Sequence, residues 1–289
     1  TAKGREAMVI KKEALPALFP ALGARVAYGD TDSIFLTFEA AGSDVQAAGA
    51  MGERVAAGLT NHFQMTLGWK GMELEHEKCF MPLHLQGKKR YFGKKYEPDT
   101  HAEVLMHLKG TDAKGVETQR RDTVPFVKQT LELLMRTLLD TRNANAAKDV
   151  LESQIQKLAD KQVSIDDLVQ KQRLSSKSEG KTDVNAAARV NFLREQREAG
   201  SAKKLNEWVE TVFVVPADLR GRRKDAKATQ FAEDADYARA NPGAVKVNYA
   251  FYFEKLRNPV QQVFAPFPEL QIPQLLKRYE AVFEAKMLD

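Results

Sequence analysis

Two aspartates separated by one residue are the strongest candidates for chemistry in this sequence. Asp30 and Asp32 lie in the run Tyr28-Gly29-Asp30-Thr31-Asp32-Ser33, between two apolar segments. Mg²⁺ prefers oxygen ligands, and two such ions about 3.5–4 Å apart can activate an attacking oxygen and stabilise a leaving one in phosphoryl transfer. Aspartates are also common in tight turns. The spacing alone therefore predicts either a metal site or an ordinary turn.

Basic side chains gather in two places. Residues 86–95 contain several of them and no acid, and a second group is interrupted only by Asp225. Such local density is typical of a surface that binds a phosphate backbone, although a solvated surface explains an isolated cluster equally well. The first group comprises Lys88, Lys89, Arg90, Lys94 and Lys95, and the second comprises Arg220, Arg222, Arg223, Lys224 and Lys227.

A third set of candidate residues alternates along a short predicted strand. Glu73, Glu75 and Glu77 share one face by the period of two, while Leu74 and His76 share the other. Glu75 and Glu77 can hold a further metal ion or adjust the electrostatics of the aspartate pair. The alternative is that they are ordinary carboxylates on the solvent face of a strand.

The elements that must position these residues follow from hydrophobic periodicity. Residues 2–15 and 44–61 have apolar side chains three and four apart, as amphipathic helices do. Between them, Arg25–Tyr28 and Ser33–Phe38 predict a β-hairpin whose connection carries both aspartates. The expected fold class is α+β, with an antiparallel sheet backed by helices. Further strands are predicted at Met72–Phe80, Lys89–Tyr96 and Glu103–Lys109.

After Gly110 the pattern becomes mostly helical, so we expect a domain boundary near residue 109. The first helix of this part is predicted to be capped by Asp122 or Thr123, with Pro125 in its first turn.

The remaining helical part contains few strand signals. Ser164 is expected to cap a short helix that ends at Val169, and residues 175–183 are expected to form an exposed loop. One strand is predicted at Glu210–Val215. Other helices are predicted at 144–161, 185–199, 248–257 and 273–286.

Composition limits the class of protein. The chain has 289 residues, of which 43% are hydrophobic, enough for a packed core. Cys79 is the only cysteine, which excludes an internal disulfide, suggests an intracellular protein and is most simply a core residue. The net charge of +5 is modest, and no apolar run reaches the ~18 residues of a membrane span, so no membrane partner is expected. The chain starts at Thr1 rather than Met, as a processed chain or a piece of a longer one does.

The motifs together resemble those of family B DNA polymerases. The run Tyr28–Ser33 is similar to the family's metal-binding motif, and Lys88-Lys89-Arg90-Tyr91 is similar to its KKRY element. Residues Gly115–Pro125 resemble the segment G-x-E-x-x-R-R-D-x-x-P that leads into the thumb. Leu74–Lys78 resembles a palm strand, usually L-E-F-E-K, with His76 at the aromatic position. All of these stand in the family's order.

Later segments resemble the thumb of delta-type enzymes and of the enzymes of large eukaryotic DNA viruses, so the resemblance covers nearly the whole chain. It implies that residues 1–109 are the C-terminal part of a palm domain and that residues 110–289 are a mostly helical thumb domain. A location in the nucleus or in a viral replication compartment would follow. The segments concerned are Ile165–Val169, Ala232–Asp234 and Asn248–Lys255.

The resemblance also implies roles for individual residues. Asp30 and Asp32 are the expected catalytic pair: Asp32 bridges two Mg²⁺ ions, for which Mn²⁺ can substitute, and Asp30 is a neighbour or partial ligand. Thr31 is expected to contact the incoming nucleotide. Tyr91 packs either against the duplex or within the sheet, and the sequence leaves both roles open. The residues expected to bind primer–template DNA are Lys88, Lys89, Arg90, Tyr91, Arg120 and Arg121.

Two motifs of the family's active site are not found in the sequence. They are D-F-x-S-L-Y-P, which supplies a further aspartate, and K-x-x-x-N-S-x-Y-G, which binds the nucleotide. We therefore expect the chain to be inactive alone and to need a companion N-terminal segment with the exonuclease, the fingers and the rest of the palm. Primer–template DNA and dNTPs are the other expected partners. A sliding clamp is an optional one, although Ala281–Asp289 does not resemble a clamp-binding peptide.

Two other functions remain open from the sequence. One is a non-catalytic DNA-binding module derived from a polymerase, in which the acids are kept for structure. The other is an unrelated metal-dependent nuclease or nucleotidyltransferase that carries the same pair of aspartates. Both acids beside a basic strand argue against the first function, and the thumb-like helices argue against the second.

Overall fold

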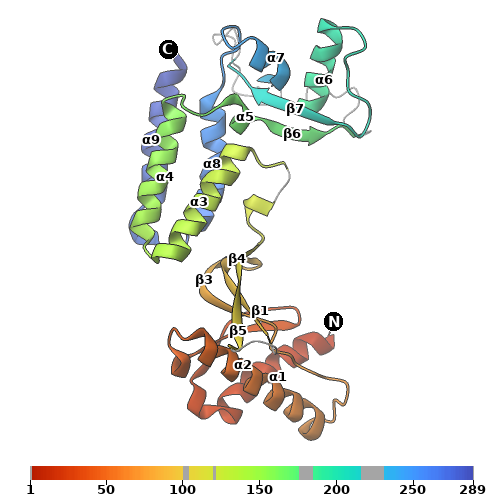
Figure 1. Cartoon of the computed structure of the whole chain (residues 1–289), viewed down its shortest axis with the longest axis vertical. Coiled ribbons are helices and arrows are strands. Elements are labelled where there is room, and N and C mark those ends of the chain that lie inside the picture. Colours follow the sequence, from red (N-terminus) through yellow and green to blue (C-terminus); the bar gives the residue numbers. More distant parts are fainter. Residues whose placement is uncertain (1, 100–103, 120–121, 176–184, 216–230, 289) are drawn as a thin grey trace. The chain divides into compact units, whose positions relative to one another are not determined.

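The computed structural model describes residues 2–99, 104–119, 122–175, 185–215 and 231–288. The chain divides into two compact units, Thr1–Gly115 (the first unit) and Val116–Asp289 (the second unit), as Figure 1 shows. Each unit contains both helices and antiparallel strands, which confirms the predicted α+β class. The division into palm and thumb stays a prediction.

The first unit contains the predicted β-hairpin. Strand β1 (Ala24–Asp30) pairs antiparallel with β2 (Ser33–Phe38), and Asp30 lies opposite Ser33 at the tip. Thr31 and Asp32 form the turn, and Thr31 has a φ of 51°, in the left-handed region that residues other than glycine seldom adopt. The prediction is therefore confirmed with one refinement, because Asp30 ends a strand and is not part of the loop.

Two predicted helices pack against this hairpin. They are α1 (Ala2–Leu18) and α2 (Val45–Asn61). The start of α2 is fixed by Asp44, whose side chain accepts hydrogen bonds from two backbone N–H groups of the first turn. Short helices follow these elements at Pro20–Leu22, Glu39–Ala41 and His62–Thr66. The core of the packing comprises Leu15, Leu22, Val55 and Leu59.

A second sheet in the first unit has three antiparallel strands in the order β3-β4-β5. They are β3 (Cys79–Gly87), β4 (Arg90–Pro98) and β5 (Met106–Lys114). The predicted start of β4 at Lys89 is one residue early, because Lys89 has a φ of 61° and belongs to the β3–β4 turn. Strand β5 continues past Lys109, where the predicted strand ended, to the end of the first unit. Glu103 lies outside the described residues.

The predicted strand Met72–Phe80 is wrong over residues 72–78, which have no regular secondary structure. The backbone of this segment bonds to side chains of the preceding helices instead of to a strand. Thr60 Oγ1 accepts from the N–H of Leu74 at 2.9 Å, and Gln64 donates to the carbonyl of Met72 at 2.9 Å. The period-of-two pattern still holds in the burial, because the three glutamates are exposed and the residues between them are half-buried.

Four long helices form the apolar centre of the second unit. They pack against one another as α3 with α4, α8 with α9, and across these pairs (Figure 1). Leu134, Leu151, Ile155, Leu256 and Leu276 are fully buried between them. The helices are α3 (Pro125–Thr141), α4 (Ala144–Ala159), α8 (Tyr249–Val263) and α9 (Ile272–Leu288). Their existence confirms the predicted helices, with ends that differ by a few residues.

The predicted cap of α3 is wrong. Val124 is the N-cap residue, without a side-chain hydrogen bond, and Pro125 occupies the first turn as predicted. Thr123 is turned away from the helix, because its Oγ1 donates to the carbonyl of Glu117 at 3.0 Å. In contrast, Ser164 caps the short helix α5 (Ile165–Leu168) as predicted.

A small sheet in the second unit was not foreseen, apart from one strand. Its order is β6-β7-β8, all antiparallel, and β7 (Trp208–Phe213) corresponds to the predicted strand Glu210–Val215. Strand β6 (Gln170–Arg173) is all polar and β8 (Ala232–Asp234) has three residues, so neither has an apolar alternation to read. Helices α6 (Ala186–Arg197) and α7 (Ala235–Ala240) flank the sheet. Of the predicted loop 175–183, only Ser175 is described.

Candidate metal and nucleic-acid site

The carboxylate of Asp30 lies between two lysines of the neighbouring sheet. Its oxygens are 3.3 Å from Lys89 Nζ and 3.9 Å from Lys114 Nζ, and Thr31 Oγ1 donates to it at 3.2 Å. Partial burial opposes its charged form, but the hydrogen bonds from Lys89 and Thr31 and the charge of both lysines outweigh this and hold the pKa of Asp30 below its usual value. Asp30 is therefore an ionised and already partnered carboxylate.

Asp32 is different, because its side chain is exposed and forms no ion pair within the described ranges. Its backbone is held from two sides. The N–H of Asp32 donates to the carbonyl of Asp30 at 2.6 Å, and Lys11 Nζ donates to the carbonyl of Asp32 at 2.9 Å. Burial lowers the pKa of Lys11, and the charge of Asp32 partly opposes that shift. The turn thus presents a free carboxylate on an anchored backbone.

The basic β3–β4 turn is bonded to strand β1, which ends at Asp30. The N–H of Lys89 donates to the hydroxyl oxygen of Tyr28 at 2.8 Å. Gly115 lies against the same turn with a φ of 69°, and a Cβ at this position would collide with the carbonyl oxygen of Lys89. Two motifs far apart in the sequence, Lys88–Tyr91 and the start of Gly115–Pro125, therefore meet beside Asp30.

An aromatic cluster joins the hairpin to the three-stranded sheet. The ring of Tyr91 lies 5.2 Å from that of Phe35 and 5.7 Å from that of Phe80, and Tyr28 closes the group. Tyr91 is only 5% exposed. Of the two roles left open by the sequence, this burial favours packing within the sheet, and a contact between Tyr91 and DNA stays a prediction.

The predicted DNA-binding residues of this turn present their charges to solvent. Lys88, Lys89 and Arg90 are all exposed. Lys89 is committed to Asp30, whereas Lys88 and Arg90 have no ion pair with any described residue. Arg120 and Arg121, and the basic group at 220–227, lie outside the described residues. The structure therefore brings Asp30, Lys89 and Lys114 together and leaves Lys88 and Arg90 available.

Glu75 and Glu77 are not assembled with the aspartates into a metal site. In the described parts of the chain, no three His, Cys, Asp or Glu side chains are close enough together to hold an ion. Glu77 instead pairs with Lys78 at 3.0 Å. The two aspartates fit a hard cation such as Mg²⁺ in the chemistry of their oxygens, and Asp32 has a free carboxylate for it, but a closed coordination shell needs ligands beyond these residues.

Cys79 fits the predicted packing role. Its Sγ lies 3.3 Å from Nε2 of His76, and burial raises the pKa of its thiol to about 11. The thiol is therefore protonated at neutral pH and unsuited to nucleophilic or metal chemistry.

Comparison with known proteins decides the family. Residues 2–267 match the family model described as DNA polymerase family B. The chain belongs to DNA polymerase family B. It is 30% identical over 259 residues to the DNA polymerase delta catalytic subunit of Caenorhabditis elegans, an alignment that covers 89% of this chain and 22% of the relative. The alternative of an unrelated nuclease or nucleotidyltransferase is thereby removed.

Other relatives agree with this placement. The delta catalytic subunit of Plasmodium falciparum is 28% identical over 241 residues, covering 83% of this chain and 20% of that protein. The mouse DNA polymerase zeta catalytic subunit is 35% identical over 147 residues, covering 51% of this chain and 4% of that protein. This family B chain thus spans about a fifth of the delta subunits that it matches. None of the helices in the described ranges has both the length and the apolar character of a membrane span.

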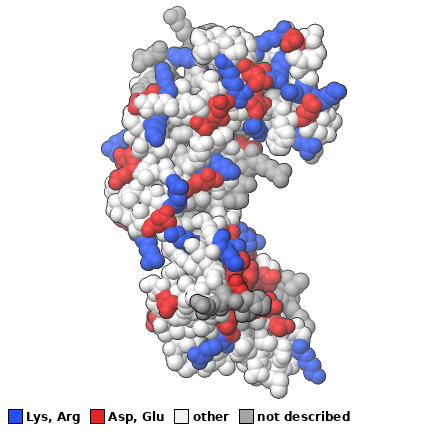
Figure 2. Space-filling model, in the orientation of Figure 1, with Lys and Arg blue, Asp and Glu red and all other residues white. Residues whose placement is uncertain are grey.

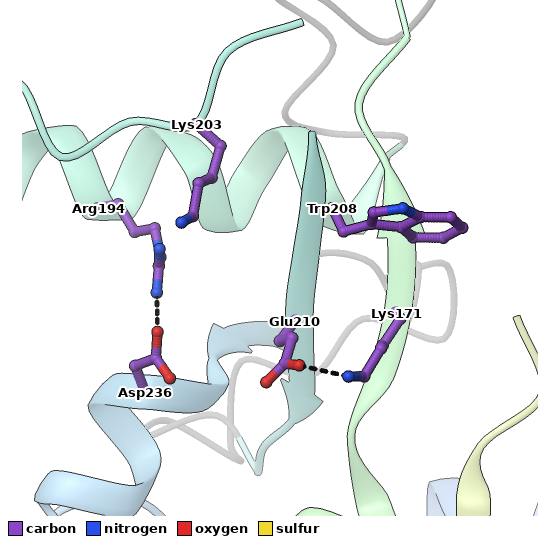
Figure 3. Close-up of a pocket in the computed structure, with 6 residues that line it drawn as sticks. All are labelled: Lys171, Arg194, Lys203, Trp208, Glu210 and Asp236. Carbon is purple, nitrogen blue, oxygen red and sulfur yellow. Dashed lines mark hydrogen bonds and ion pairs between the residues drawn. The ribbon is translucent and has the colours of Figure 1, made fainter. Parts of the chain in front are cut away.

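The second unit of this family B chain contains a cavity of about 580 Å³ beside the β6-β7-β8 sheet. Figure 3 shows that its charged lining residues face one another: Arg194 bonds to Asp236, and Lys171 bonds to Glu210 at 2.7 Å. Arg194 also bonds to Asp234 at 2.9 Å. On the face of the second unit in Figure 2, basic and acidic side chains are likewise interspersed. This ion-paired network joins residues far apart in the sequence, so no local motif indicates it, and it holds helices and strands together.

Proposed function

We propose that this chain is the metal-binding and duplex-binding part of a DNA-directed DNA polymerase, which extends a primer 3′ end on a DNA template by nucleotidyl transfer. One observation carries the proposal. In this family B chain, the hairpin that presents the exposed Asp32 is also bonded to a basic turn, through Tyr28 and Asp30. The free carboxylate of Asp32 lies two residues from Asp30, and Asp30 pairs with Lys89 of the basic turn. Metal ligands and phosphate contacts are thereby fixed relative to each other.

The acids have unequal roles in this proposal. Asp32 would hold both Mg²⁺ ions, or Mn²⁺ in their place, and Asp30, restrained by Lys89 and Lys114, would be a partial ligand. When bound, two such ions activate the primer 3′ oxygen and stabilise the leaving pyrophosphate. Thr31 donates to Asp30 and so keeps the partial ligand in place, and its predicted contact with the nucleotide is part of the proposal. Glu75 and Glu77 would act only as outlying negative charges.

The basic turn would bind the newly formed duplex without reading its sequence. Lys88 and Arg90 are free to contact phosphates, and Lys89 can reach the duplex edge while its backbone stays bonded to Tyr28. Contacts to phosphates position a duplex but carry no sequence information, which suits an enzyme that copies any template. Arg120 and Arg121 are proposed to contact phosphates of the duplex as well.

The proposal includes partners that this chain does not supply. A companion segment would bring the fingers, the remaining palm strands with the third aspartate, and the exonuclease. Primer–template DNA and dNTPs would be the substrates, and a sliding clamp an optional partner. We assign residues 1–109 to the palm and 110–289 to the thumb, and the site of action to the nucleus or a viral replication compartment.

The test is primer extension by the complete enzyme with Asp32→Ala. Removing the bridging carboxylate should abolish extension while duplex affinity stays within about twofold, since exposed residues away from the contact contribute little. The 289-residue chain by itself should not extend a primer in Mg²⁺ and dNTPs. Near-normal extension by the Asp32 variant would remove that residue from the metal site, and extension by the chain alone would refute its dependence on a companion.

A second candidate is a DNA-binding module of polymerase origin without catalysis. The pairing of Asp30 with two lysines favours it, because such pairing can keep an acid for structure alone. Duplex binding by the wild-type complete protein without nucleotide incorporation at any Mg²⁺ or Mn²⁺ concentration would select this candidate.

A further inference from the structure

A buried lysine reaches the turn that carries Asp32. The side chain of Lys11, in the third turn of α1, is only 5% exposed, although lysines are seldom buried without a partner. Its Nζ donates to the backbone carbonyl of Asp32 at 2.9 Å. Hydrogen bonds from a charged donor are roughly twice as strong as neutral ones. Lys11 is thus bonded to the turn that presents the free carboxylate of Asp32.

A second contact fixes the position of α1 against the hairpin tip. Met8 lies three residues before Lys11 and therefore on the same helix face. A Cβ added to Gly29 would lie 2.6 Å from the terminal methyl of Met8, so the absence of a side chain at Gly29 lets α1 approach the strand. Met8 therefore lies against Gly29, and Lys11 bonds to Asp32, so one face of α1 meets the chain on both sides of Asp30. The same face is anchored to the core by Leu15, which is 1% exposed.

The other hydrogen bonds of the turn are local, because the N–H of Asp32 and the hydroxyl of Ser33 both donate to the carbonyl of Asp30, at 2.6 and 3.3 Å. Thr31 is in the left-handed region, which costs about 1 kcal/mol or more for a residue with a Cβ, so the conformation must be held by its surroundings. Because the peptide group is planar, fixing the carbonyl of Asp32 also fixes the next N–H and the position of the Asp32 Cα, from which the carboxylate extends. The hydrogen bond from Lys11 is therefore suited to aim the carboxylate.

We propose that Lys11 is a positioning residue that holds the Asp32 carboxylate in the direction needed to bind metal ions. This inference rests on the proposed function. Lys11 acts on metal binding in two opposing ways: its bond orders the ligand, and its positive charge repels the cation. The bond acts at 2.9 Å inside the protein, whereas the exposed Asp32 carboxylate and its ion are screened by solvent. Ordering therefore dominates, and removal of the ammonium should weaken metal binding.

The experiment compares Lys11→Met with Lys12→Met in the complete enzyme. Methionine keeps the apolar stem and removes the ammonium, and Lys12 is the exposed neighbour on the same helix. For Lys11→Met, we expect the Mg²⁺ concentration for half-maximal incorporation to rise about tenfold and kcat at saturating Mg²⁺ to fall less, since misplaced groups cost up to about 10²-fold. Lys12→Met should match wild type in both quantities.

A second measurement tests the hydrogen bond between Lys11 and Asp32 without an activity assay. In the 289-residue chain, hydrogen exchange at the N–H of Asp32 and Ser33 should accelerate in Lys11→Met and not in Lys12→Met. Lys11→Arg keeps a charged donor, and should fold and restore most of the Mg²⁺ affinity, which distinguishes a lost anchor from a damaged helix. An unchanged or lowered Mg²⁺ requirement in Lys11→Met would overturn the role of Lys11. A wild-type enzyme without Mg²⁺-dependent incorporation would instead overturn the proposed function.

Discussion

The hairpin tip of the first unit and the small sheet of the second unit are both rich in charge, and they differ in what the charges face. On the helices beside the sheet, Arg194 and Arg239 are each bonded to more than one carboxylate, and Arg197 makes a two-pronged contact with Glu233. At the tip and the adjoining β3–β4 turn, the carboxylate of Asp32 and the cations of Lys88 and Arg90 have no ion-pair partner among the described residues. Charges bonded internally hold a fold together, whereas charges left free are available to a ligand.

The difference also shows why charge density is a poor guide to function. In the sequence both regions contain basic and acidic residues close together. They differ only in which of these side chains form ion pairs in the folded chain. The cavity in Figure 3 is lined by several charged side chains, and its cations are largely neutralised by the acids that they face. The tip and the adjoining β3–β4 turn instead combine an unpaired carboxylate with cations that have no ion pair to a described residue, and these are the groups to which the proposed function assigns metal and phosphate.

The largest effect expected from this contrast is on the stability of the second unit. Arg194→Met leaves Asp234, whose side chain is 9% exposed, without its cation, so the free energy of unfolding should fall by about 3 kcal/mol. Hydrogen exchange of β7 amides measures this. The control is Lys203→Met in the same cavity, where Lys203 has no carboxylate partner within the described residues and the change should be below about 0.5 kcal/mol. Equal losses in both variants would contradict the contrast.

The next effect concerns DNA. The double variant Lys88→Ala with Arg90→Ala should weaken duplex binding about tenfold in low salt and reduce the slope of log K against log salt by about one for each lost phosphate contact. Titrations of a labelled duplex at several salt concentrations test this. Lys171→Ala, whose ammonium is bonded to Glu210, serves as the matched control and should leave the slope unchanged. A slope that responds only to Lys171 would place the duplex on the second unit.

A smaller effect is expected where the two motifs are joined. Tyr28→Phe removes the hydroxyl that accepts from the N–H of Lys89, so the first unit should lose about 1 kcal/mol of stability. Because the aromatic ring remains in its cluster, the loss of stability should be local, and faster hydrogen exchange should be confined to Lys89 and its neighbours. Tyr96→Phe, in strand β4 of the three-stranded sheet, provides a tyrosine control in the same unit. Unchanged exchange at Lys89 would show that this bond does not hold the basic turn.

The smallest effect is the pH dependence contributed by Asp30. Its pKa is lower in the folded chain than in the unfolded one, so its pairing stabilises the fold above its usual value of 3.8. Below that pH the unfolded chain takes up the proton first, and the contribution declines until the folded carboxyl is protonated as well. Urea unfolding between pH 5 and pH 2 should therefore be less pH-dependent in Asp30→Asn than in wild type. A steeper dependence in the variant would mean that the sign of the shift is wrong.

Local signals in the sequence predicted the hairpin and most helices correctly. Asp44, Asn185 and Asn248 stand at the starts of predicted helices, and all three are N-cap residues whose side chains accept backbone hydrogen bonds. Such caps depend on a few neighbouring residues and can be read locally. The predicted strand is wrong at 72–78 because the structure there depends on distant residues. The backbone of this segment bonds to the side chains of Thr60 and Gln64 and not to another strand.

The site was predictable in its residue types and not in its connections. The two aspartates and the KKRY element are visible as motifs, but nothing local indicates that Lys89 pairs with Asp30. Lys11 looked like an ordinary helix lysine, because the turn that it bonds lies 21 residues away in the sequence. Strands β6 and β8 were missed for the same reason, since tertiary pairing alone makes such short polar segments strands.

In the proposed function Asp32, the free carboxylate of the tip, is the metal ligand. Anomalous scattering of Mn²⁺ in crystals of the complete enzyme, with primer–template and a non-hydrolysable nucleotide, tests it most directly. We expect an anomalous peak about 2–2.5 Å from an Asp32 carboxylate oxygen. A Mn²⁺ peak beside the nucleotide phosphates with the Asp32 carboxylate out of contact would contradict it.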